Sequence, residues 1–155
     1  MVQLIALDVD GTMVDSKGDV PDEIFNAIRQ AQKSGILVTI ISGRTRRSLS
    51  NLLQKAQIDL PYAGSNGGFI ASPSHTDPLV TYPINSKDVS AIVQMRTACN
   101  YTGISFHYID QTYYDPGGYA WIKSIAAPWA VYARESDLSF MIGGIACTTE
   151  NRNHG

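Results

Sequence analysis

The stretch LIALDVDGT, residues 4–12, decides the fold prediction, because four apolar residues lead directly into two aspartates, Asp8 and Asp10. A short apolar run followed by a helical pattern is typical of a parallel strand covered on both faces. The two carboxylates therefore follow the strand where open α/β sheets bind ligands. Because side chains alternate along an extended backbone, both should lie on the same side.

Two neighbouring carboxylates repel each other unless a cation neutralises them or they take separate acid and base roles. A magnesium ion takes oxygen ligands and commonly accompanies phosphate, so it would suit such a pair. A bare pair would favour a solvated turn, or Asp10 as a helix cap. The full apolar strand with D-x-D-G-T favours a site.

The composition narrows the class of protein. The chain has 155 residues, of which 44% are hydrophobic and 17% charged, which predicts one globular domain with room for a small insert. A formal net charge of −2 gives no reason to expect a nucleic-acid or membrane surface, so the expected partner is a small molecule. The chain has two distant cysteines and no signal-peptide pattern, which favours a cytoplasmic protein. It has no apolar run near 18 residues, so no membrane span is expected.

Strand and helix patterns alternate over the first part of the chain. Strands are expected at 3–7 and 36–41, with a helix between them over 21–35. A second helix should bury a stripe formed by Leu49, Leu52, Leu53 and Ala56. This order predicts a βαβ unit in an α/β layer.

From residue 72 the pattern changes to α+β. A strand is expected in LVTYPI (79–84), a helix in SKDVSAIVQMRTAC (86–99) and strands from GISFHYI (103–109) onward. We therefore expect residues 1–71 to form the first layer and 72–140 an inserted α+β unit. Residues 141–155 show neither the helical nor the strand pattern of hydrophobic residues and are expected to be a disordered tail.

A second motif, IISGRT (40–45), places Ser42 directly after the second strand and at the expected start of the next helix. A hydroxyl and free backbone N–H groups at such a position can hold phosphate oxygens. Ser42 alone would more readily be a plain helix N-cap, but its occurrence together with DVDGT favours the phosphate role. SNGG (65–68) predicts a turn in which Asn66 either faces a substrate or serves only the turn. Arg46 and Arg47 are expected on a solvated helix face.

These motifs together resemble the haloacid dehalogenase (HAD) superfamily of phosphohydrolases, in its Cof-type branch, over residues 1–68. The resemblance implies a Rossmann-like parallel sheet with an inserted α+β cap, so that 1–71 is the first half of the core and 72–140 the cap. It implies that Asp8 attacks phosphorus and becomes an aspartyl phosphate, while Asp10 protonates the leaving oxygen and later activates water.

The same resemblance implies a magnesium cofactor held by the Asp8 carboxylate and the Asp10 carbonyl. It also implies substrate-binding roles for Ser42, Gly43, Arg44 and Asn66. The family's phosphate-steadying lysine and its late G-D-x-x-N-D motif have no counterpart: after Lys55 the remaining lysines are Lys87 and Lys123, both in the expected cap.

Without the late motifs we expect an incomplete sheet whose first strand is an exposed edge, able to self-associate. We expect such a truncated chain to hydrolyse phosphate esters poorly by itself. The favoured function is a magnesium-dependent phosphatase of small phosphorylated metabolites, such as sugar or cofactor phosphates.

The alternatives are a non-catalytic or regulatory binding module of the same fold, and a phospho-accepting receiver domain. The receiver domain fits less well because its accepting aspartate lies on a later strand. A phosphomutase would share the nucleophile, but the large insert favours the hydrolases.

Overall fold

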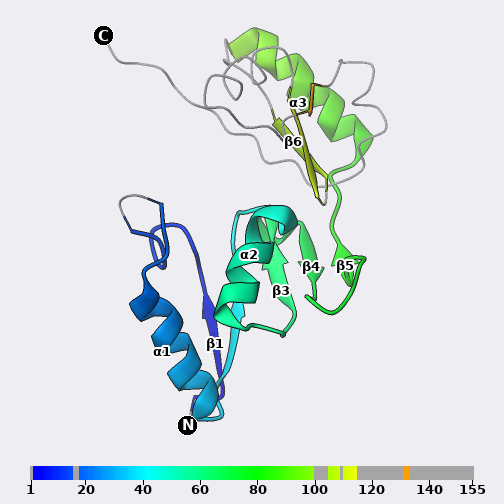
Figure 1. Cartoon of the computed structure of the whole chain (residues 1–155). Coiled ribbons are helices and arrows are strands. Elements are labelled where there is room, and N and C mark those ends of the chain that lie inside the picture. The colour runs from blue at the N-terminus through cyan, green and yellow to red at the C-terminus, as the bar shows by residue number, and fades with distance from the viewer. Residues whose placement is uncertain (1, 16–17, 100–104, 109, 115–130, 133–155) are drawn as a thin grey trace, which may run out of the picture. The chain divides into compact units, whose positions relative to one another are not determined.

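The computed structural model describes residues 2–15, 18–99, 105–108, 110–114 and 131–132 (Figure 1). The chain divides into two compact units, Met1–Thr81 and Tyr82–Gly155. The first contains β1 (Leu4–Leu7), α1 (Asp22–Lys33), β2 (Leu37–Ile40), α2 (Arg46–Ala56), β3 (Tyr62–Gly64), the 3-10 turn η1 (Ser65–Gly67), β4 (Phe69–Ala71) and β5 (Val80–Thr81). The second contains α3 (Ser86–Cys99), β6 (Ser105–Tyr108), β7 (Gln111–Tyr114) and β8 (Val131–Tyr132). Among the described residues, no helix is both long and apolar enough to span a bilayer.

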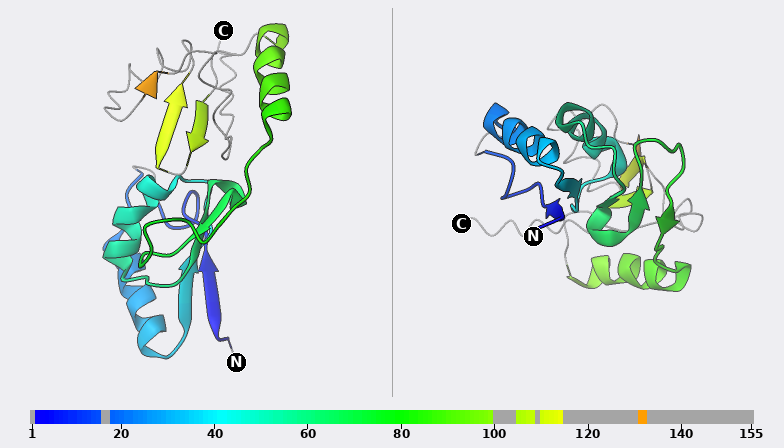
Figure 2. Two further views of the ribbon diagram at one scale, coloured as in Figure 1. Left: turned by 90° about the vertical axis from the view of Figure 1, so that its right-hand side faces the viewer. Right: turned by 90° about the horizontal axis from the view of Figure 1, so that it is seen from below.

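Strands β1 and β2 are parallel and joined through α1, which confirms the predicted βαβ unit. The register runs from Leu4 opposite Leu37 to Leu7 opposite Ile40. Helix α1 begins after Pro21, whose fixed φ suits the N-terminal boundary, and the chain leaves it through Gly35 at a φ of 78°. Figure 2 shows α1 and α2 on the same side of these strands.

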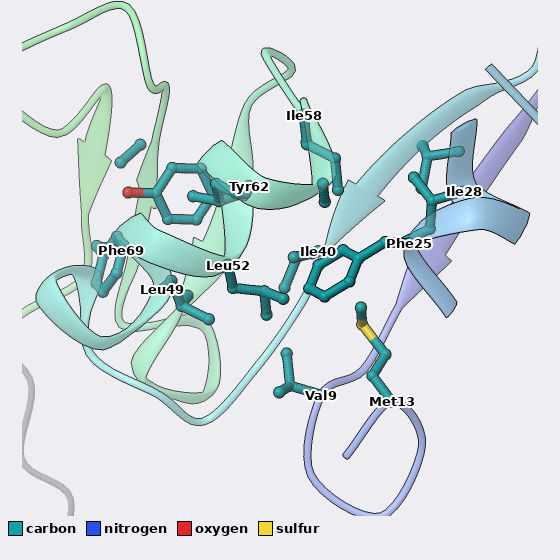
Figure 3. Packing of buried hydrophobic residues seen from close by; sticks show 14 residues of the cluster. Val9, Met13, Phe25, Ile28, Ile40, Leu49, Leu52, Ile58, Tyr62 and Phe69 are labelled. Carbon is teal, nitrogen blue, oxygen red and sulfur yellow. The ribbon is translucent and has the colours of Figure 1, made fainter. Parts of the chain in front are cut away.

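The core of the first unit lies between the helices and the sheet (Figure 3). The predicted stripe of α2 is buried in full, and α1 contributes Phe25 and Ile28. Strand β2 supplies Val38 and Ile40; Thr39 between them is also buried, whereas Leu37 and Ile41 on either side of this run are exposed. Helical and strand periods therefore converge on one apolar cluster, as the sequence pattern predicts.

The opposite face of β1 and β2 has exposed apolar residues on either side of the buried Thr39. Leu4, Leu37 and Ile41 are 54%, 52% and 52% exposed, whereas Ile40 is fully buried. The expectation of strands covered on both faces, drawn from the strand pattern, is therefore wrong for the described part of the chain, where the helices cover one face only. The exposure agrees instead with the loss of cover expected from the missing late motifs. Among the described strands β1 pairs with β2 alone, which is the incomplete parallel sheet expected from the missing late motifs.

Strands β3, β4 and β5 form a separate antiparallel sheet, with Gly64 opposite Phe69. A single parallel bridge between Ile41 and Ala63 connects the end of β2 to β3. Strand β5 follows the predicted boundary at residue 71, yet it pairs with β4 inside the first unit. The division into a core half and an inserted cap stays a prediction.

In the second unit, α3 coincides with the helix predicted over 86–99, and β6 pairs with β7 in an antiparallel hairpin. Strand β8 adds to β7 in parallel and was not predicted. Val89 of α3 and Phe106 of β6 are buried, in keeping with an apolar interior for this unit. The expected end of the cap near residue 140 and the expected tail at 141–155 lie outside the described residues.

Candidate active site

The loop after β1 turns tightly around Val9. The Val9 side chain is fully buried, and its carbonyl accepts hydrogen bonds from the amides of Met13 (2.9 Å), Val14 (3.2 Å) and Thr12 (3.3 Å). Asp8 and Asp10, on either side of Val9, are both exposed. This agrees with the alternation that predicted both carboxylates on one side.

The loop after β2 lies next to the end of β1. The amide of Ile41 donates to the carbonyl of Leu7 at 2.9 Å, so Ser42 and Asp8 follow neighbouring strand ends. Ser42 is buried; its amide donates to Ala63 O at 3.1 Å, and its Oγ accepts the amide of Arg44 at 3.2 Å. The carboxyl ends of the two parallel strands thus bring the two sequence motifs together.

Helix α2 begins later than expected. Its first residue is Arg46, and its N-cap is Thr45, whose Oγ1 accepts the amide of Ser48 at 3.4 Å. The predicted position of Ser42 at the helix start is therefore wrong, and so is its alternative as the N-cap. Ser42 instead closes the loop that leads into the helix. Of the two arginines that open α2, Arg47 is exposed and Arg46 is half-buried.

The η1 turn packs against the same loop. Amides of Asn66 and Ser65 donate to the carbonyls of Ser42 (3.2 Å) and Arg44 (2.9 Å). Asn66 is left-handed (φ 54°, ψ 37°), as its turn role predicts, and its Oδ1 would lie 2.9 Å from a Cβ at Gly43. Glycine at position 43 therefore permits the close approach of the Asn66 side chain to the loop.

Asp10 and Arg44 form an ion pair that joins the two motifs. Arg44 Nε donates to Asp10 Oδ2 at 3.0 Å, and Arg44 Nη2 donates to Asp10 Oδ1 at 2.7 Å. The hydrogen bonds from Arg44, aided by its charge and opposed by partial burial, hold the pKa of Asp10 below its usual value. The same hydrogen bonds raise the pKa of Arg44.

This pair was missed by the sequence reasoning, which gave Arg44 a substrate-binding role. The two residues are 34 positions apart, and no local spacing rule reaches that far. The Asp8 carboxylate, in contrast, has no hydrogen-bond or ion-pair partner among the described residues. The two aspartates therefore differ: one is held by a cation and the other is accessible.

The donor set for a divalent cation is small. Within the described ranges, no group of three or more His, Cys, Asp or Glu side chains is placed to share a metal ion. Magnesium commonly uses only one or two protein carboxylates, with water and substrate phosphate completing its shell. The accessible carboxylate of Asp8 fits that mode, and a ligand role for the Asp10 main-chain oxygen would leave the Arg44 ion pair intact.

Comparisons with known proteins place the chain in a family. The profile of the haloacid dehalogenase-like hydrolases matches residues 5–136, and the chain belongs to this family. Phosphatase YwpJ of Bacillus subtilis is 38% identical over 72 residues, which cover 46% of this chain and 25% of YwpJ. The 5-amino-6-(5-phospho-D-ribitylamino)uracil phosphatase YwtE of the same organism is 38% identical over 69 residues, 44% of this chain and 23% of YwtE.

The fold has relatives among solved structures as well. A haloacid dehalogenase-like hydrolase from Bacteroides thetaiotaomicron superposes with a TM-score of 0.72 at 17% identity, over 94% of this chain and 56% of that one. The chain thus corresponds to about half the length of this structural relative, and its matches span about a quarter of YwpJ and YwtE. Its architecture is that of a HAD-type α/β protein with an incomplete parallel sheet.

Proposed function

We propose that this chain provides the nucleophile half of a magnesium-dependent phosphatase that hydrolyses small phosphorylated metabolites. The observation that carries the proposal is the unequal state of the two aspartates. Asp8 is exposed and unpartnered among the described residues, whereas Asp10 is held by Arg44 from the second motif. Separate nucleophilic and acid–base roles require two carboxylates in different environments, and Asp8 and Asp10 meet that condition.

In the first step, an Asp8 carboxylate oxygen attacks phosphorus as the bond from phosphorus to the ester oxygen breaks. The leaving oxygen takes a proton from Asp10, which must therefore be protonated when the substrate is bound although Arg44 favours its ionised form in the free protein, and the product alcohol departs. Asp8 then carries the phosphoryl group as an acyl phosphate. Its exposure at the end of β1 leaves an approach for the substrate.

In the second step, Asp10 removes a proton from water, which attacks the phosphorus of the acyl phosphate. The bond between phosphorus and the Asp8 oxygen breaks, inorganic phosphate leaves, and both aspartates return to their starting protonation. A bound magnesium ion would supply positive charge that offsets the repulsion between phosphate and carboxylate. We propose that Ser42 and Asn66 orient the substrate from the two adjacent loops. Gly43 contributes because its lack of a side chain lets these loops approach each other.

The substrate class is proposed from the relatives. YwtE is named for 5-amino-6-(5-phospho-D-ribitylamino)uracil, a phosphorylated ribityl compound, and YwpJ is named as a phosphatase. Sugar or cofactor phosphates are therefore the proposed substrates. The chain's formal net charge of −2 gives no reason to expect a polyanion as its partner.

The test is turnover of p-nitrophenyl phosphate by the purified 155-residue chain, with and without magnesium chloride, for which the missing late motifs predict a low, magnesium-dependent rate. Asp8→Asn keeps the size of the side chain and removes the nucleophile, so it should abolish magnesium-dependent release of p-nitrophenolate. Arg47→Gln, on the exposed face of α2, is the matched control and should retain the parent rate. Activity that survives Asp8→Asn would refute the assigned nucleophile.

A non-catalytic or regulatory binding module of the same fold is the second candidate, and the missing counterparts of the family's lysine and late acidic motif favour it. The two functions separate in one comparison. A binding module would bind inorganic phosphate saturably, as changes in the amide chemical shifts around Ser42 would report, and it would not turn over the aryl phosphate. The phosphatase would show both.

A further inference from the structure

The guanidinium of Arg44 engages the whole carboxylate of Asp10. Nε and Nη2 each donate to a different oxygen, at 3.0 and 2.7 Å, and a longer Nε contact to Oδ1 measures 3.3 Å. Two parallel hydrogen bonds between planar groups fix both the position and the plane of the carboxylate. A lysine at the same position would supply the charge without this orientation.

Both partners stand on restrained main chain. The amide of Arg44 is bound to Ser42 Oγ at 3.2 Å, and its carbonyl accepts the amide of Ser65 at 2.9 Å. On the other side, Asp10 follows Val9. The buried side chain of Val9 and its carbonyl, which accepts three hydrogen bonds, anchor the loop. The ion pair therefore connects two fixed loops, and the rotamer of Asp10 is the main freedom that it removes.

Stability alone does not explain this arrangement. The side chains of Arg44 and Asp10 are 29% and 59% exposed, and ion pairs with such access to water contribute little to folding. Substrate attraction does not explain it either, because the charge of Asp10 offsets that of Arg44 before any phosphate arrives. Orientation of the Asp10 carboxylate is the effect that the geometry supplies most directly.

We propose that Arg44 is a positioning residue that holds the Asp10 carboxylate in one orientation at the carboxyl ends of β1 and β2. The catalytic part of this inference rests on the proposed phosphatase function, in which Asp10 transfers the proton. The structural part, a single Asp10 rotamer maintained by Arg44, does not depend on that function. The two parts can therefore fail separately.

The structural part is tested by NMR on the isotopically labelled 155-residue chain. Three-bond couplings to Asp10 Cγ report its χ1 angle, and they should indicate one rotamer in the parent and averaging in Arg44→Gln. Arg47→Gln should leave the couplings unchanged. The Nε–H resonance of Arg44 should shift in Asp10→Asn. Averaged couplings in the parent, or couplings that Arg44→Gln leaves unchanged, would overturn the inference without reference to turnover.

The catalytic part is tested by kinetics with p-nitrophenyl phosphate and magnesium. Arg44→Gln should lower kcat about 10- to 100-fold with KM nearly unchanged, because misplacement of a proton-transfer group affects the chemical step. Arg44→Lys should recover only part of the rate. In an Asp10→Asn background, Arg44→Gln should have no further effect on kcat, since the group it positions is no longer an acid.

A rise in KM with kcat unchanged would identify Arg44 as a substrate clamp and overturn the positioning role. Additive losses in the double variant would do the same. If the parent shows no turnover while the NMR couplings respond as expected, the phosphatase proposal fails for this chain and Arg44 remains the residue that orients Asp10.

Discussion

Replacement of Gly64 by alanine tests how closely β3 and β4 approach each other beside the site. The Gly64 backbone has a φ of −132° and a ψ of 176°, an extended conformation that alanine adopts without strain. A Cβ there would lie 2.1 Å from Phe69 Cζ, 2.6 Å from its Cε1 and 2.9 Å from the carbonyl oxygen of Arg44. The perturbation is therefore purely steric.

The magnitude follows from these distances. Carbon atoms in ordinary contact are about 3.5–4.0 Å apart, so the edge of the Phe69 ring must move by about 1.5 Å. Phe69 is only 3% exposed and meets Tyr62 edge-on, with centroids 6.1 Å apart, so the ring has little room. Overpacking of this kind costs about 1–3 kcal/mol, and we expect Gly64→Ala to lower the free energy of unfolding by that amount.

Urea unfolding followed by circular dichroism measures the effect, with Phe69→Leu and the double variant as controls. Because Phe69→Leu removes the clashing ring atoms, the loss from Gly64→Ala should shrink in that background, with a coupling of about 0.5–3 kcal/mol. Unchanged stability of Gly64→Ala would refute the close packing. Strict additivity in the double variant would refute Phe69 as its cause.

Three further predictions concern the helix cap, the ion pair and the exposed sheet face. Thr45→Ala removes the capping hydroxyl and should lower the free energy of unfolding by about 1 kcal/mol. Thr45→Ser keeps the hydroxyl and should leave the free energy of unfolding close to that of the parent, and urea titrations of both variants measure the difference. Because Arg44 lowers the pKa of Asp10 from 3.8, the pair stabilises the metal-free fold above that pH and less as the pH falls through the folded pKa. The difference in free energy of unfolding between the parent and Asp10→Asn is at most about 1 kcal/mol at pH 7 for so exposed a pair, and it should therefore disappear below about pH 4. A difference that grows as the pH falls would contradict the pairing. Leu37→Glu, on the exposed face of β2, should reduce concentration-dependent association in sedimentation velocity without loss of stability, and a variant that associates as the parent does would exclude this face.

The sequence predicted most of the first unit because its signals are local. The buried stripe of α2 and the apolar runs of β1 and β2 repeat with the period of their own element. The start of α2 was misplaced because both Ser42 and Thr45 are good capping residues, and only the path of the loop selects Thr45. Local patterns also do not show whether the second face of a sheet is covered, so the exposure of Leu4 and Leu37 was not foreseen from the strand pattern alone.

The sequence predicted where the candidate residues stand on the strands but not how they connect, and their roles in a site stay a prediction. Asp8, Asp10 and Ser42 follow strand ends, and parallel strands bring such ends to one edge. The Asp10–Arg44 pair and the contact of Asn66 with Gly43 depend on how two loops pack, which no spacing within one motif encodes. Strand β8 is only two residues long, so no alternating pattern in the sequence could predict it.

The buried side chain of Val9 has a consequence for how damage to this site would look in a mutational scan. An apolar residue stands between the two aspartates, fills the core and supplies the carbonyl on which three amides converge. Val9→Ala would leave every polar group in place, yet the cavity would loosen the loop that spaces both carboxylates. A substitution in this position would score as a loss of activity although it touches no reacting atom, so a scan that records activity alone would count a packing residue among the catalytic ones.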